Sequence, residues 1–246
     1  MANWQDPRTT SVNTATVGVP RAARDAGLRS YMLSVYNYMA SGVLLTGIIA
    51  MLFAPYAGQV LLSASGRGMS MLGWIIILSP LAIVFAMSFG MARMRTSTLQ
   101  ILFWAFAALM GLSMSTLFLA YTGVSIAQTF FATAAAYLGL SLYGYTTKRD
   151  LSGFGTFLIM GVVGILVAML VNMFLQSSAM ALAISAIGVL LFAGLTAYDT
   201  QRIKSLYFQV AGTDMAGKTV IMGALQLYLD FINMFQFLLM FMGNRR

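Results

Sequence analysis

Seven runs of apolar residues, each long enough to cross a membrane as a helix, dominate the sequence. A transmembrane helix needs about 20 apolar residues to span a hydrocarbon core of about 30 Å, and it satisfies its backbone hydrogen bonds internally, as lipid requires. We expect spans at residues 31–54, 70–92, 97–121, 124–147, 154–176, 179–204 and 219–243, with a longer loop from Pro55 to Met69. The chain is therefore predicted to be an all-α membrane protein in which consecutive helices are antiparallel neighbours.

Charged residues are too few for a soluble domain of this size, at 8% of 246 residues against 60% hydrophobic residues. We expect residues 1–29, rich in Thr, Ser, Ala and Arg, to form a mobile N-terminal tail, and residues 30–246 to form one transmembrane domain. The tail lacks the features of a secretory signal. The basic segment 21–31, which overlaps the end of the tail, is predicted to be an unstructured lead-in, the alternative being a segment that lies on the membrane surface.

His, Cys and Glu are absent, which excludes several kinds of functional site. Without Cys or His the chain cannot form disulfides, thiol nucleophiles, or zinc and iron–sulfur sites of the usual kinds. No Ser stands beside a recognisable base, so we expect neither an enzyme nor a resident cofactor. A response to pH near neutrality would have to use Asp, Tyr or Lys, because no imidazole is available.

The basic residues are distributed unevenly about the predicted spans and give a net charge of +8. Eleven of the 14 lie on the side of the N-terminus: Arg8, Arg21, Arg24, Arg29, Arg93, Arg95, Lys148, Arg149, Arg202, Lys204 and Lys218. Cytoplasmic loops are enriched in Lys and Arg, so the N-terminus is predicted to be cytoplasmic. We attribute the charge to topology and to anionic lipid headgroups, and expect no nucleic-acid binding. The terminal pair Arg245 and Arg246 leaves open a re-entrant last segment in place of a full crossing.

The last apolar run carries a full charge, Asp230, near its middle. A carboxylate at bilayer depth costs about 3 kcal/mol even on insertion scales, so such residues are usually functional. In a helix, Asp230 shares one face with Gln226, Asn233 and Gln236, which we expect to point into a bundle and to offer a path for a cation. Asp199, in the sixth span, is the other acid at membrane depth.

Asp199 and Asp230 lie on two antiparallel spans at comparable predicted depths, so their carboxyl groups could meet. Both cannot ionise cheaply in a site of low dielectric, and one proton would then be shared, which makes the pair a candidate pH sensor. The counter-charges would be Arg93 and Arg95, at the end of the second span, or Arg202, three residues from Asp199. The structural alternative is that each Asp only caps a helix or fixes packing.

Calcium is the cation that such a site would suit, because Ca²⁺ takes oxygen ligands. It requires six to eight of them, whereas two aspartates supply at most four. We therefore expect Asp199 and Asp230 to form at most a weak calcium site.

Two segments together resemble the Bax inhibitor family, also called transmembrane Bax inhibitor motif proteins. They are the stretch from Ala197 to Lys204 (AYDTQRIK) and the stretch from Ala224 to Phe235 (ALQLYLDFINMF). The resemblance implies a central last helix wrapped by the other six and a pH-sensitive calcium leak. It also implies that Asp199 and Asp230 are the pH sensor, latched to an arginine near the end of the second span, here Arg93 or Arg95. Some members carry a Glu in the second span, and this chain has none.

The sequence thus predicts a calcium leak channel of the bacterial inner membrane, with lipid and calcium ions as its partners. The alternative is a membrane-embedded regulator of a membrane protease or a stress pathway, which would act through contacts with a membrane protein partner. A retinal receptor is disfavoured, because no lysine follows Lys218 in the last span.

Overall fold

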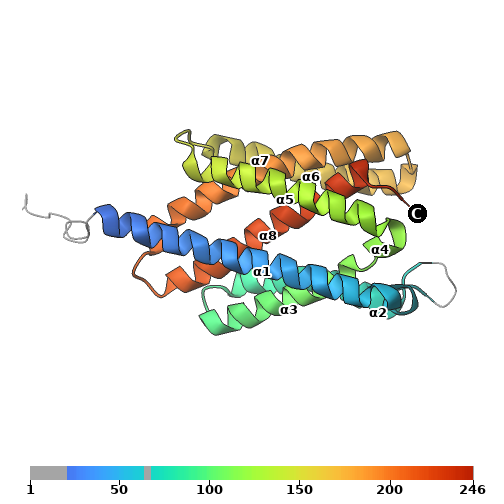
Figure 1. Cartoon of the computed structure of the whole chain (residues 1–246), viewed down its shortest axis with the longest axis horizontal. Coiled ribbons are helices and arrows are strands. Elements are labelled where there is room, and N and C mark those ends of the chain that lie inside the picture. The colour runs from blue at the N-terminus through green and yellow to red at the C-terminus, as the bar shows by residue number, and fades with distance from the viewer. Residues whose placement is uncertain (1–20, 64–67, 246) are drawn as a thin grey trace, which may run out of the picture.

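The computed structural model describes residues 21–63 and 68–245, which fold as a helical bundle (Figure 1). Its helices are α1 (Arg21–Leu61), α2 (Met71–Gly90), α3 (Thr96–Met114), α4 (Leu117–Ala120), α5 (Gly123–Thr146), α6 (Ser152–Leu175), α7 (Ser178–Val210) and α8 (Met215–Met242). Among the described residues, seven helical stretches are long and apolar enough to span a membrane, with α3 and α4 together forming the third. The predicted class, an all-α protein with seven transmembrane spans, is confirmed.

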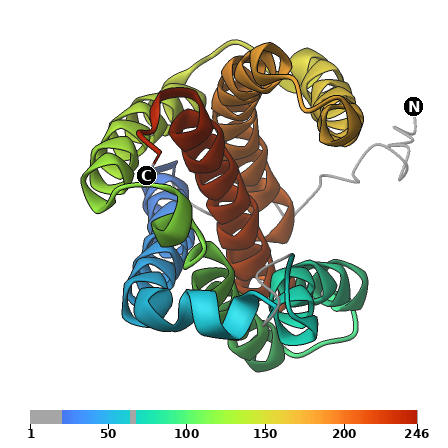
Figure 2. The ribbon, with the colours of Figure 1, turned by 90° about the vertical axis from the view of Figure 1, so that its right-hand side faces the viewer.

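Helix α8 lies at the centre of the bundle, as the end-on view in Figure 2 shows. It packs directly against α1, α3, α5 and α7, while α2 and α6 pack mainly on the outer sides of α3 and α7. More of α8 is buried than of any other span. Residues on nearly all faces of α8 are therefore inside the protein, and its polar side chains are shielded from lipid by the neighbouring helices.

The core around α8 is built on aromatic contacts. Tyr228 is fully buried and meets the rings of Phe103 and Phe106 of α3 edge to face, with centroids 6.4 and 5.0 Å away. Its hydroxyl lies 2.6 Å from Thr46 Oγ1 of α1, which donates to the carbonyl oxygen of Ala107 at 2.8 Å. Because the Thr46 proton is used on Ala107, the Tyr228 hydroxyl acts as the donor to Thr46.

Helix α1 is longer than predicted at both ends. It begins at Arg21, so the lead-in expected to be unstructured is helical there, because Leu28 is buried and Gly27 lies against the ring of Tyr207 in α7. It continues through Pro55 to Leu61, because Ala57 and Leu61 are buried in a small cluster with Ile76 of α2. The predicted loop from Pro55 is therefore shorter, and the prediction for residues 1–20 lies outside the described residues.

Two other boundaries differ from the predicted spans. The third span is interrupted at Ser115 and Thr116, whose hydroxyls donate to the carbonyl oxygens of Leu112 and Ser113 and compete with the helical backbone bonds. Helix α7 runs on to Val210, with Tyr207 packed on Tyr31 of α1 at a centroid distance of 5.4 Å. Its connection to α8 is therefore only residues 211–214, where Gly212 takes a positive φ of 77°.

Candidate functional site

Helices α7 and α8 hold the two membrane acids on facing surfaces. The helices are antiparallel, joined by a four-residue connection, and form the most extensive helix pair of the bundle. Asp199 is 3% exposed and Asp230 is 4% exposed. Both carboxyl groups are therefore inside the protein, at the interface between the central helix and its closest neighbour.

The structure brings these two carboxyl groups together. The side chains of Asp199 and Asp230 lie close enough for their charges to interact, and Gln226, one turn before Asp230, lies near Asp199. A carboxylate can only accept a hydrogen bond, so a hydrogen bond between the two carboxyl groups requires a proton on one of them. Within the described part of the chain, Asp230 Oδ2 is buried and has no hydrogen-bond partner. The pair can thus hold or release a proton.

Hydroxyl groups surround the pair on the side of α5. Tyr137 is buried and close enough to interact electrostatically with both aspartates, and its hydroxyl has no hydrogen-bond partner among the described residues. Thr200, next to Asp199, lies 3.1 Å from Ser141 Oγ, which lies 2.6 Å from the hydroxyl of Tyr36 in α1. This chain of hydroxyls connects α7, α5 and α1 beside the acidic pair.

Of the three predicted counter-charges, only Arg202 interacts electrostatically with Asp199 in the structure. Its side chain is exposed, so solvent weakens this attraction. Arg93 and Arg95 are exposed in the turn between α2 and α3, and neither is among the groups that act on Asp199 or Asp230. A latch between the second span and the aspartates stays a prediction.

The other polar residues of α8 point toward different neighbours. Asn233 Nδ2 donates to the carbonyl oxygen of Leu229 in its own helix, at 2.8 Å. Asn233 and Gln236 line a cavity of about 130 Å³ between α6, α7 and α8, beyond the aspartates along α8. The predicted polar face thus divides into an acidic part against α7 and an amide part beside this cavity.

The donor set fits a weak calcium site better than a tight one. Two carboxylates and the Gln226 amide provide hard oxygen atoms, which calcium prefers, but fewer than the six to eight that it takes. Among the described residues, no group of three or more His, Cys, Asp or Glu side chains could hold a metal ion. Additional ligands would have to be water or backbone carbonyls.

Sequence reasoning missed the contribution of α5. Ser125, Thr129, Thr133, Tyr137 and Ser141 are all buried and are spaced four residues apart, which places them on one face of the helix. This four-residue spacing of hydroxyl residues is the sequence pattern that would have predicted a polar face on α5. It shows that α5 turns a polar face toward the interior of the bundle.

Comparisons with known proteins show the family to which this chain is related. Residues 28–246 match the family model described as inhibitor of apoptosis-promoting Bax1. The chain is 49% identical to an uncharacterized protein of Rickettsia prowazekii, over 90% of this chain and 92% of the relative. It is 45% identical to the inner membrane protein YbhL of Escherichia coli, over 90% and 94% of the two chains, and 45% identical to an uncharacterized protein of Caulobacter vibrioides, over 90% and 91%.

These matches cover almost the whole transmembrane bundle, so they apply to the protein as a unit. The seven apolar helices and the likeness to an inner membrane protein support a multi-pass protein of the inner membrane. The chain therefore belongs to the Bax inhibitor family, in which YbhL of Escherichia coli is a bacterial member.

Proposed function

We propose that the protein is a calcium-permeable leak channel of the inner membrane, with a cytoplasmic N-terminus and with Asp199 and Asp230 as its pH-sensitive gate. The observation that carries this proposal is the contact between two buried carboxyl groups on the central helix and its closest neighbour. Burying two acids together is costly, and such residues in membrane helices usually serve ion or proton movement. A purely structural role would be filled at lower cost by apolar side chains.

In this proposal, the arrangement with α8 packed against α7 is the closed gate. With one proton shared, the pair carries one negative charge and a charge-assisted hydrogen bond, which is stronger than a neutral one. That bond joins α8 to α7, and Arg202 adds an attraction to the same charge. The central helix is thus held against its neighbour across the expected cation path.

Acidification is expected to open the gate. A second proton neutralises the pair, which removes the charge-assisted bond and the attraction to Arg202. The contact between α7 and α8 weakens, and the equilibrium shifts toward an arrangement in which α8 no longer blocks the path. The cation flux should therefore rise as the pH falls.

Calcium is the proposed cation because the path offers only oxygen and amide groups. The carboxyl oxygens suit a hard divalent cation, and the small number of ligands suits passage, since an ion that binds too tightly does not leave. Gln226, Asn233 and Gln236 continue the polar surface of α8 on either side of Asp230. Their amide oxygen atoms would replace part of the hydration shell of the calcium ion as it passes.

The test is calcium influx into liposomes that contain the purified protein and a calcium-sensitive dye, measured over a series of pH values. We expect the pH dependence to disappear in Asp199→Asn and in Asp230→Asn. Asp150→Asn, which changes an exposed acid in the loop before α6, is the matched control and should behave like the parent. Variants at Asp199 and Asp230 that keep the parent's pH response would overturn the gate.

The same assay separates this function from the alternative one. A regulator that acts by helix contacts with a membrane protein partner would show no calcium flux in liposomes. It would instead retain a stoichiometric partner through purification in mild detergent. Flux from the isolated protein therefore favours the channel.

A further inference from the structure

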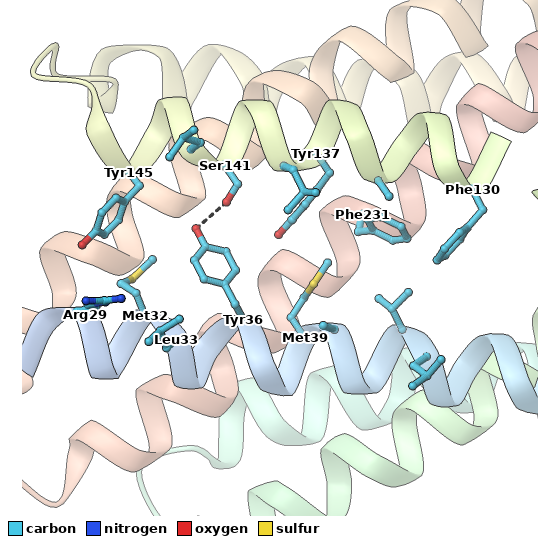
Figure 3. Close-up of a pocket in the computed structure, with 16 residues that line it drawn as sticks. Arg29, Met32, Leu33, Tyr36, Met39, Phe130, Tyr137, Ser141, Tyr145 and Phe231 are labelled. Carbon is cyan, nitrogen blue, oxygen red and sulfur yellow. Dashed lines mark hydrogen bonds between the residues drawn. The ribbon is translucent and has the colours of Figure 1, made fainter. Parts of the chain in front are cut away.

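A long cleft lies between α1 and α5, with α8 forming its floor (Figure 3). Its volume is about 710 Å³. Its walls include Met32, Tyr36 and Met39 of α1 and Tyr137 of α5, and Phe231 of α8 lies at its base. Both helices pack on α8, and their backbones stay apart along the cleft. One side-chain hydrogen bond crosses it, between Tyr36 of α1 and Ser141 of α5 at 2.6 Å (Figure 3).

The cleft opens toward lipid and not toward water. Its rims are apolar side chains that are at least half exposed, namely Leu33, Leu44, Leu138 and Leu142. In a membrane-spanning bundle such residues face hydrocarbon. The natural occupant of a deep apolar cleft at this position is an acyl chain.

One end of the cleft is positively charged. Arg29 lines that end, and its side chain is exposed (Figure 3). Within the described part of the chain it has no ion-pair partner, so its guanidinium is available to an anion. Tyr145 lines the same end of the opposite wall, and its carbonyl oxygen accepts a hydrogen bond from Lys204 of α7 at 2.7 Å. Lys204 also lies over the Tyr145 ring, which places a second positive charge behind that wall.

The cleft is long enough to take an acyl chain from one leaflet of a bilayer. From Arg29 to Val43, both of which line it, α1 rises by about 21 Å. Half of a hydrocarbon core is about 15 Å. A headgroup at Arg29 would therefore sit at the membrane surface, while the acyl chain reaches the middle of the bilayer beside Phe231.

We propose that the cleft between α1 and α5 binds one acyl chain of an anionic phospholipid, with the phosphate held by Arg29. The proposal does not rest on calcium conduction. It places the acyl chain against Phe231, the residue that follows Asp230, and against Tyr137, which interacts with both aspartates. An acyl chain in the cleft would thus pack against two residues that lie beside the acidic pair.

The experiment uses the whole protein in bilayers with trace phosphatidylglycerol that carries a photoreactive group in its acyl chain, followed by peptide mapping. We expect labelling concentrated on cleft residues such as Leu33 and Leu138. Phe157 and Phe174 on the outer face of α6, which are similarly exposed, serve as the comparison surface. Lipid that merely surrounds the protein would label both surfaces equally, and that result would overturn the proposal.

Headgroup specificity is tested with a photoreactive phosphatidylcholine of the same chains and with Arg29→Gln. One basic side chain near an anionic surface contributes a factor of about five in binding, so Arg29→Gln should reduce cleft labelling by phosphatidylglycerol about five-fold. Arg24→Gln, an exposed basic residue outside the cleft, is the control and should have no effect. An equal effect of both variants, or equal labelling by both lipids, contradicts a site for an anionic lipid.

Occupancy by the acyl chain itself is tested with Ala134→Trp, which places a large ring in the cleft. We expect cleft labelling to fall for both lipids, with unchanged labelling of α6. Unchanged labelling of the cleft in this variant would show that the chain lies elsewhere. Since Arg29→Gln changes only an exposed side chain, the proposal remains testable even if Ala134→Trp does not fold.

Discussion

The hydroxyl of Tyr228, on the central helix, donates a hydrogen bond to Thr46 of α1 over a distance of 2.6 Å. Both side chains are buried, and Thr46 in turn donates to Ala107 of α3. This chain of bonds ties three helices together at one level of the bundle. It fixes α8 against α1 and α3 about half a turn from Asp230, so any movement at the proposed gate would occur on the side of α8 that faces α7.

The two ends of this bond should tolerate mutation differently. In Tyr228→Phe, Thr46 keeps its bond to Ala107, and we expect a loss of about 0.6 kcal/mol, the average for polar pairs in a membrane bundle. In Thr46→Val, the buried Tyr228 hydroxyl loses its partner, which costs about 1–3 kcal/mol. Unfolding in mixed SDS micelles measures both. A Tyr228→Phe variant that is the less stable of the two would show that the direction of donation is wrong.

Gly144 of α5 lies directly against the carbonyl of Ala197 in α7, two residues before Asp199. A methyl group there would push the helices apart, so Gly144→Ala should destabilise the protein by about 1–3 kcal/mol. Gly139→Ala, in the same helix but facing open space, is the control and should be neutral or stabilising by up to about 1 kcal/mol. The same SDS unfolding assay applies. Equal effects of the two substitutions would contradict a close approach at Gly144.

The fold was largely predictable because apolar runs of sufficient length have few alternatives in a membrane. Hydropathy could not locate the helix ends. Helix α1 continues past Pro55 because Leu61 finds a buried position against α2, and α7 continues to Val210 because Tyr207 packs on Tyr31. These extensions depend on tertiary contacts, which no local pattern contains.

The acidic pair was predictable for a related reason: a charge inside an apolar run is rare enough to stand out. Tyr137 did not stand out, because a tyrosine in a membrane helix is common and its importance comes only from its position beside Asp230. The sequence named three candidate counter-charges but could not choose among them. Which arginine acts on Asp199 depends on how the ends of α2 and α7 are placed, and in this structure the charge of Arg202 acts on it.

Asp150, in the loop before α6, is an acid outside the membrane-spanning helices whose titration can be measured. The backbone N–H of Ser152 donates to its Oδ1 at 2.9 Å, and this bond together with one from the Ser152 hydroxyl lowers the pKa of Asp150. Because the pKa of Asp150 is lower in the folded protein than in the unfolded chain, its ionised form stabilises the folded state at pH values above the ordinary Asp pKa. This stabilisation is lost as the pH falls through the lowered pKa. NMR titration should show this, and Ser152→Ala should raise the pKa part of the way back. An unchanged titration in Ser152→Ala would assign the shift to the backbone bond alone.

The last prediction distinguishes the candidate counter-charges by their effect on the proposed gate. Arg202 attracts the negative charge of the acidic pair, so its loss in Arg202→Gln should make the second proton easier to add. The profile of calcium flux against pH should then move to higher pH. Arg93→Gln changes an exposed side chain that does not act on the pair in this structure, and its profile should match the parent. A shift caused by Arg93→Gln but not by Arg202→Gln would instead support a latch from the second span, with the conducting cycle passing through an arrangement in which the end of α2 approaches Asp199.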